Sequence, residues 1–317
     1  CGVNEEDQDA TNEFSFIILD AAYNMRTPKT NVALRYHPKI NPDIVSRAID
    51  VIGTGVGYPA IFNDDAMISI IRRQGWSYEE ARNYMIIGCV AWGIPGKNYS
   101  QYTGSNSVIN LGKCLELALN RGVDMLNGKQ LGCVTPDPKE FTCLEDVWDA
   151  YLSQVRFIAD KVTKINDLVM GIRQKYQHYP FSSPLVDGCI ERGKDVLDWT
   201  EHSYTLCLCA GNTNVADSLA AIKKFVFEEK IISMEELVEI LKNNWEGHEE
   251  LRLKFLNEAP KFGNDDDYVD EITAAVHRRT DEVMAEFKDC YGYPWSMDGT
   301  IAAGYYPWGR RTAATPD

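Results

Sequence analysis

Stretches with helical periodicity alternate with short apolar runs along this chain of 317 residues. The pattern predicts helices at residues 14–25, 41–53, 107–121, 143–176, 216–229, 233–244 and 268–291. It predicts strands at residues 32–36, 85–90, 203–209 and 299–305. Strands that are separated by long helices pair in parallel, because an antiparallel neighbour needs only a short turn. We therefore expect an α/β fold whose chemistry lies at the carboxyl ends of the strands.

Composition excludes two kinds of partner. The chain has 32 Lys and Arg against 47 Asp and Glu, a net charge of -15, so a polyphosphate such as nucleic acid would be repelled. No apolar run is long enough to cross a membrane, and no signal peptide precedes the first helix. The nine cysteines are scattered and odd in number, which favours reduced thiols in the cytoplasm over a disulfide framework. With no repeat and no flexible linker, we expect residues 1–317 to form a single domain.

One cysteine ends an apolar run at the entrance to a loop that contains glycine and proline. Ser77 and Glu80 have the spacing of a helix capping box, so a helix precedes the strand at 85–90 and Cys89 lies near the strand's carboxyl end. Its apolar neighbours favour a packing role, and they disfavour an ionic nucleophile because apolar surroundings raise the pKa of a thiol. Radical chemistry is compatible with these surroundings, since a thiyl radical exchanges hydrogen through a neutral S–H.

The segment around Cys89 resembles a known family. Residues 88–90 (Gly-Cys-Val) and 95–97 (Pro-Gly-Lys) resemble the active-site cysteine loop of glycyl radical enzymes, the pyruvate formate-lyase-like superfamily. Further stretches resemble motifs of this family and follow one another in its order: 9–13, 25–28, 35–37, 57–64, 115–122, 189–195, 214–224 and 314–317. The motif that bears the stored radical, Arg-Val-Ser/Ala-Gly-aromatic, is absent. Because the chain also starts at Cys1 without a methionine, we expect it to be the middle to C-terminal part of the lyase domain.

The resemblance implies both a fold and a chemistry. The fold would be part of a ten-stranded α/β barrel of two parallel half-barrels, surrounded by helices, with the cysteine loop in its centre. Cys89 would be the residue that becomes a thiyl radical and takes hydrogen from a small organic substrate. The glycyl radical that generates it would sit on a glycine missing from this chain, installed by a radical SAM activating enzyme. We thus expect no cofactor and no metal on this chain, no activity of the chain alone, and a homodimer in the full enzyme.

The residue two positions after the cysteine limits the types of reaction that we expect. In the branch that cleaves choline, dehydrates diols or hydroxyproline, or decarboxylates hydroxyphenylacetate, that residue is typically glutamate, whereas here it is Ala91. Alanine cannot accept a proton, so base-assisted elimination would need another group, for which Glu201 and His202 are the candidates. Arylacetate decarboxylation is therefore the leading hypothesis. A dehydratase or amine lyase with a relocated base, and a noncatalytic lyase-like subunit, are the alternatives.

Other residues are candidates for binding the substrate. Arg35 and His37 lie at the end of a predicted strand and are suited to a carboxylate, although a structural hydrogen bond is equally typical of such a histidine. Aromatic side chains near the pocket loops suit a planar substrate, although most aromatics serve the core. Cys207 and Cys209 share one strand face, for which packing is the better interpretation. The remaining candidates for substrate binding are Ala91, Trp92, Tyr102, Cys209, Asn212 and Tyr305.

Overall fold

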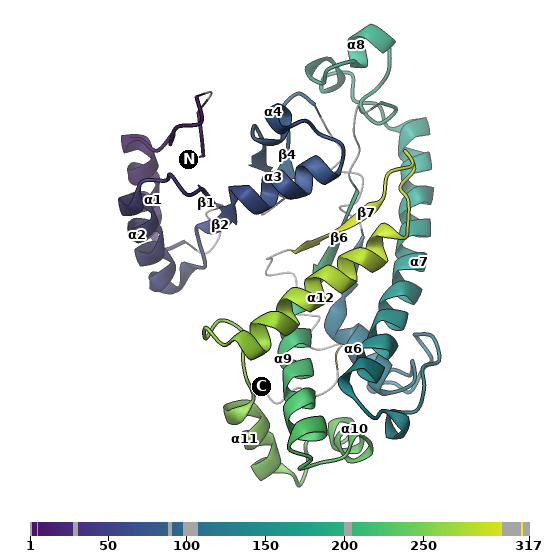
Figure 1. Ribbon diagram of the computed structural model, residues 1–317. Coiled ribbons are helices and arrows are strands. Elements are labelled where there is room, and N and C mark those ends of the chain that lie inside the picture. Colours follow the sequence, from purple (N-terminus) through teal and green to yellow (C-terminus); the bar gives the residue numbers. More distant parts are fainter. Residues whose placement is uncertain are drawn as a thin grey trace. The chain divides into compact units, whose positions relative to one another are not determined.

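A computed structural model describes residues 2–4, 6–27, 31–87, 91–97, 107–199, 205–299 and 312 (Figure 1). The chain divides into two compact units. Unit 1 comprises Cys1–Gln101 and His178–Ser203, and unit 2 comprises Tyr102–Gln177 and Tyr204–Asp317. That residues 1–317 form a single domain stays a prediction, because two compact units can belong to one domain or to two.

Unit 1 begins with two helices that pack on a small parallel sheet. Helices α1 (Glu13–Met25) and α2 (Pro42–Val51) lie side by side, and β1 (Ala33–Tyr36) pairs in parallel with β2 (Ala60–Asn63) (Figure 1). Leu34 of β1 is buried together with side chains of both helices. A π-helical turn, Ile52–Val56, follows α2. The predicted helices at 14–25 and 41–53 and the predicted strand at 32–36 are confirmed.

The rest of unit 1 contains a short strand pair. It contains α3 (Asp64–Arg73), α4 (Tyr78–Ala81), a 3₁₀ turn (Ser183–Leu185), α8 (Cys189–Arg192), and the strands β3 (Met85–Ile87) and β4 (Ala91–Gly93). The capping box is confirmed: the Ser77 hydroxyl accepts from the Glu80 N–H, and the Glu80 carboxylate accepts from the Ser77 N–H.

Strands β3 and β4 depart from the expected parallel pattern. The predicted strand at 85–90 is confirmed for Met85–Ile87, but β3 and β4 pair antiparallel. Only three residues separate them in the sequence, and a parallel crossover needs about a dozen. Connection length therefore decides the direction of this pair.

Unit 2 is built on a parallel sheet with strand order β5-β6-β7. Its strands are β5 (Val108–Asn110), β6 (Thr205–Ala210) and β7 (Trp295–Gly299). Five of the six residues of the central strand β6 are buried, as is typical of a parallel strand covered on both faces. In Figure 1, α12 runs beside β7, with which it is in contact. The helices of this unit are α6 (Leu111–Leu119), α7 (Leu144–Tyr176), α9 (Asn212–Ile222), α10 (Met234–Lys242), α11 (Glu249–Glu258) and α12 (Asp267–Ala285), with a 3₁₀ turn at Pro138–Glu140 and a π-helical segment at Lys223–Glu228.

Several predicted boundaries in unit 2 were wrong, each for a local reason. The helix expected at 107–121 starts only at Leu111, because residues 108–110 pair with β6 and Asn110 caps the helix by accepting from the Lys113 N–H. The helix expected at 268–291 ends at Ala285. Beyond it, the Asp289 carboxylate accepts from two backbone N–H groups of a tight turn that leads into β7. The strand expected at 299–305 starts earlier, at Trp295, and residues 300–305 lie outside the described part of the chain.

The parallel pairs in both units confirm the α/β class. The described residues contain one three-stranded and two two-stranded sheets, so the ten-stranded barrel stays a prediction. Among the described helices, none combines the length and the apolar character needed to cross a bilayer.

The core of unit 2 allows a direct test. Leu219 of α9 is fully buried in it, whereas Leu253 of α11 is 41% exposed. We expect Leu219→Ala to lower the free energy of unfolding by about 2–5 kcal/mol, because it removes buried methyl groups and leaves a cavity. Leu253→Ala, the matched control, should change it by about 0.5 kcal/mol or less. Urea unfolding followed by circular dichroism measures both; equal midpoints for the two variants would contradict this packing.

Candidate functional site

The predicted site residues fall into two groups. Those that the structure describes are Arg35, His37, Ala91 and Trp92 in unit 1 and Cys209 and Asn212 in unit 2. The others lie outside the described residues: Cys89, Glu201, His202, Tyr102 and Tyr305. Around Cys89, the structure therefore describes the segments that end at residue 87 and begin at residue 91.

Strands β3 and β4 flank Cys89 in the sequence. Their register pairs Ile87 with Ala91 and Ile86 with Trp92. Neighbouring side chains on a strand point to opposite faces, so Ala91 and Trp92 project to opposite sides of the pair. Trp92 is buried and Ala91 half-buried. A substrate-binding role for these two residues stays a prediction.

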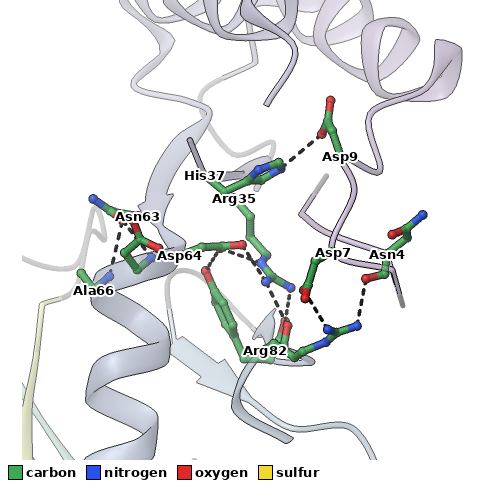
Figure 2. A network of polar contacts seen from close by, with 11 residues as sticks. Asn4, Asp7, Asp9, Arg35, His37, Asn63, Asp64, Ala66 and Arg82 are labelled. Carbon is green, nitrogen blue, oxygen red and sulfur yellow. Dashed lines mark hydrogen bonds and ion pairs between the residues drawn. The ribbon is translucent and has the colours of Figure 1, made fainter. Parts of the chain in front are cut away.

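A buried polar network precedes β3 (Figure 2). Arg35, on β1, makes a two-pronged ion pair with Asp64, the first residue of α3: Nε donates to Oδ1 at 2.9 Å and Nη2 to Oδ2 at 2.8 Å. The Tyr84 hydroxyl donates to the same carboxylate at 2.6 Å. The Arg35 guanidinium also lies over the Tyr84 ring, 4.0 Å from its centroid. Three elements of unit 1 thus meet at one carboxylate.

The surroundings of Tyr84 keep its hydroxyl protonated. Burial, together with the hydrogen bond to Asp64, raises the pKa of Tyr84 well above its usual value, so the phenol stays protonated and donates. Asp64 lies in the first turn of α3, where the helix dipole favours a negative charge. The Asp64 and Arg35 side chains are only 4% and 13% exposed, so this ion pair is screened far less than a surface pair.

Arg82 connects the same region to the N-terminal segment. Its Nη1 donates to the Asp7 carboxylate at 2.7 Å and its Nη2 to the Asn4 carbonyl at 2.9 Å, as Figure 2 shows. Nearby, the His37 ring pairs with Asp9 at 3.2 Å. Burial alone would raise the pKa of Asp9, but hydrogen bonds from Thr11 and Asn41 and the nearby His37 outweigh it and lower that pKa. Asp9 is therefore an anion, and His37 donates to it through Nε2.

The segment after β4 is also tied down. The Lys97 ammonium lies 3.7 Å from a Glu80 carboxylate oxygen and 3.3 Å from one of Asp187. The backbone N–H of Asp187 donates to the Gly96 carbonyl at 2.8 Å. Anchors within unit 1 therefore hold the chain on both sides of the β3–β4 pair.

In unit 2, the two candidates have different surroundings. Cys209 is 1% exposed and belongs with Cys207 to the hydrophobic core, as expected for packing. Asn212 begins α9 directly after β6, and its buried Oδ1 has no partner among the described residues. At the same end of the sheet, the Asn110 amide donates to the Thr312 hydroxyl at 3.1 Å. A substrate-binding role for Cys209 or Asn212 stays a prediction.

Sequence reasoning proposed Arg35 and His37 together as a carboxylate-binding pair, but the structure places each beside its own aspartate. Arg35 donates to Asp64 and to backbone carbonyls, while His37 pairs with Asp9. Their binding of a substrate carboxylate stays a prediction, and the contacts observed are structural. The roles of Asp64, Tyr84 and Arg82 were missed, because only tertiary contact reveals a buried acceptor between distant segments. Among the described residues, no three acidic, histidine or cysteine side chains gather so as to hold a metal ion.

A family model and several known proteins match nearly the whole chain. Residues 1–311 match the family model described as pyruvate formate lyase-like. The chain is 35% identical over 306 residues to the trans-4-hydroxy-L-proline dehydratase of Clostridioides difficile, which covers 96% of this chain and 37% of that protein. It is 30% identical to the indoleacetate decarboxylase of Tractidigestivibacter scatoligenes, covering 96% of this chain and 38% of that protein.

A solved structure is similar over the whole chain. The glycerol-bound B12-independent glycerol dehydratase from Clostridium butyricum superposes with a TM-score of 0.85 at 31% identity, covering 100% of this chain and 40% of that one. The chain thus spans less than half the length of the relatives it matches.

The buried carboxylate of unit 1 can be tested by neutralising it. Asp64→Asn should lower the free energy of unfolding by about 3 kcal/mol, because the Arg35 charge then lacks its buried counterion. Asp20→Asn is the control: Asp20 pairs with Arg47 at 2.7 Å but is 55% exposed, so we expect a loss of about 1 kcal/mol or less. Urea unfolding measures both. A loss for Asp64→Asn no larger than for Asp20→Asn would show that the Arg35–Asp64 pair adds nothing beyond a surface contact.

Proposed function

Because the chain belongs to the pyruvate formate lyase-like family, we propose that it carries the hydrogen-transferring cysteine of a glycyl radical lyase. The proposal is supported by the family match over residues 1–311 and by the resemblance of residues 88–90 and 95–97 to the family's cysteine loop. It concerns a full-length protein containing this chain. There a radical SAM activating enzyme would install the glycyl radical, which would supply the unpaired electron. We also propose a small-molecule substrate, a homodimer and a cytoplasmic location.

In the proposed reaction, Cys89 transfers hydrogen in both directions. The Cys89 thiyl takes a hydrogen atom from a substrate carbon, which forms an S–H bond and leaves a carbon radical. After the substrate has lost a fragment, the product radical takes the hydrogen atom back and the thiyl is restored. The cycle consumes no external oxidant or reductant. It requires a thiol that stays neutral, which apolar surroundings favour because they raise a thiol pKa.

Decarboxylation of an arylacetate is our first candidate reaction. Its overall balance is ArCH₂COO⁻ + H⁺ → ArCH₃ + CO₂: Cys89 takes a hydrogen atom from the CH₂ group, carbon dioxide leaves, the remaining carbon takes a proton from solvent, and Cys89 returns the hydrogen atom. The cycle therefore removes no proton from the substrate and needs no base beside the abstraction site. Ala91, at the position where the family resemblance leads us to expect a glutamate, supports it because alanine cannot accept a proton. The 30% identity to an indoleacetate decarboxylase is consistent with the same reaction class.

Elimination is the second candidate, and the relatives favour it. The chain is 35% identical to a hydroxyproline dehydratase and 31% identical to a glycerol dehydratase. Loss of water, or of an amine, would require a group that replaces the missing base, and Glu201 and His202 are the sequence candidates. A noncatalytic lyase-like subunit is the third candidate. It would be excluded by an Arg-Val-x-Gly-aromatic motif in the remainder of the full-length protein.

Replacing Cys89 tests the proposed family chemistry. In the full-length protein, Cys89→Ala should abolish product formation, because the substrate radical can be neither formed nor quenched. The glycyl radical signal in electron paramagnetic resonance (EPR) should survive anaerobic activation, since radical installation acts on the separate glycine. The 317-residue chain alone is the negative control and should turn over nothing. Product formation by Cys89→Ala would remove this residue from the mechanism.

A substrate panel separates the two candidate reactions. The activated full-length enzyme should release carbon dioxide from indole-3-acetate or phenylacetate, which carry no phenol that a base would have to deprotonate. It should be inactive on choline, glycerol, propane-1,2-diol and trans-4-hydroxy-L-proline, since these lose the roughly 10²- to 10⁴-fold that a positioned base contributes. Product analysis under anaerobic conditions measures each rate. Turnover of any of the four, with both arylacetates inert, would establish elimination and would mean that Glu201, His202 or another group has replaced the lost base.

A further inference from the structure

The Arg35 guanidinium directs its donors at the backbone that enters β3 as well as at Asp64. Nη1 donates to the Tyr84 carbonyl at 2.9 Å and Nη2 to the Arg82 carbonyl at 3.0 Å. Arg82 ends helix α4, and Tyr84 immediately precedes β3. A guanidinium from β1 therefore satisfies two carbonyls at the turn from α4 into β3, where helical partners are absent.

The same guanidinium is fixed from several directions. Both oxygens of Asp64 accept from it, and the Tyr84 ring lies 4.0 Å from it. Gly2 lies against it as well, since a Cβ on that residue would come within 3.1 Å of the Arg35 Cζ. The Tyr84 hydroxyl binds Asp64 in turn, so side chain and backbone of one residue are held by the same ion pair. All three nitrogens of Arg35 thus have acceptors, which suits holding the backbone better than binding a substrate.

Strand β3 has little support of its own beyond this anchor. It has three residues, and within the described part of the chain it pairs only with the equally short β4. Two three-residue strands supply few ladder hydrogen bonds. A fixed entry at Arg82 and Tyr84 therefore sets where Ile87, the last residue of β3, and its partner Ala91 lie.

We propose that Arg35, held by Asp64 and Tyr84, is a positioning residue that fixes the backbone entering β3 and thereby aligns Cys89 for hydrogen transfer. The inference rests on the proposed function and adds a role for residues that make no contact with the reacting atoms. The physical reason is distance: misplacing reacting groups by about 1 Å can cost about 10²-fold in rate.

The chain offers a matched control in the same unit. Arg47 donates to Asp20 at 2.7 Å and lies 4.3 Å from the centroid of the Tyr23 ring, so an arginine, an aspartate and a tyrosine meet here too, with one described arginine–aspartate hydrogen bond in place of the two-pronged pair. These residues lie on α1 and α2, and no described contact links Arg47 to β3 or β4. Arg47→Lys and Tyr23→Phe therefore make the same substitutions at an arginine–aspartate pair of unit 1 that does not anchor β3.

The test uses the full-length enzyme, activated anaerobically, with the panel substrate of highest rate. Arg35→Lys, which cannot reproduce the two-pronged geometry, should lower kcat per glycyl radical spin about tenfold or more, with KM within about threefold. Tyr84→Phe keeps the ring and should also lower kcat per glycyl radical spin, by a smaller factor than Arg35→Lys. Both control variants should match the unmodified enzyme. Because rates are counted per radical spin, a general loss of folded or activated protein does not move this readout.

A second measurement needs no substrate. Hydrogen–deuterium exchange, followed by mass spectrometry of the peptide 85–93, should be faster in Arg35→Lys and Tyr84→Phe than in the two controls. Unchanged exchange, or a Tyr84→Phe enzyme with unmodified kcat per spin, would overturn the positioning role even if Arg35→Lys did not fold. Activity of Cys89→Ala would instead refute the proposed lyase chemistry, so the two failures are distinguishable.

Discussion

The ion pair between Arg35 and Asp64 is the interaction on which unit 1 depends. It joins β1 to the start of α3, and through the Tyr84 hydroxyl and two backbone carbonyls it reaches the entrance of β3. A buried carboxylate is costly alone, and the half-buried Arg35 guanidinium supplies the charge that offsets this cost. The Tyr84 hydroxyl donates to the same carboxylate, and burial together with Asp64 keeps this phenol protonated. Segments up to 49 residues apart are thereby held in one arrangement.

The sheet of unit 2 is organised mainly by the burial of apolar side chains. The middle strand β6 is apolar on both faces, and α6 and α9 follow β5 and β6 directly. Both helices therefore begin at the carboxyl ends of their strands, where Asn212 leaves a buried acceptor without a described partner. Parallel α/β folds place their ligands at this end of the sheet. Each unit thus has polar groups near the end of a strand: the ion-paired Arg35 in unit 1 and the buried Asn212 oxygen in unit 2.

The site predicted from sequence and the geometry agree in emphasis but not in every role. Cys89 was chosen from a short apolar run before a glycine- and proline-containing loop and from its resemblance to a family motif; it lies outside the described residues, so its role stays a prediction. Arg35 was chosen as a charged residue at a strand end. The structure places its charge against Asp64, because a guanidinium of low exposure takes the nearest carboxylate and carbonyls available. In our proposal, the substrate class depends on Ala91 and on whether another group replaces the base that alanine lacks.

Sequence by itself determined the α/β class, most helices and the capping box at Ser77, because periodicity and capping depend on residues close together in the chain. It also determined the family, through short motifs in a fixed order. Tertiary structure alone decided that residues 108–110 form a strand and not the start of a helix, since pairing with β6 is a long-range contact. It alone brought Arg35, Asp64 and Tyr84 together. Their pairing follows from burial, and no local pattern records which distant carboxylate a buried arginine meets.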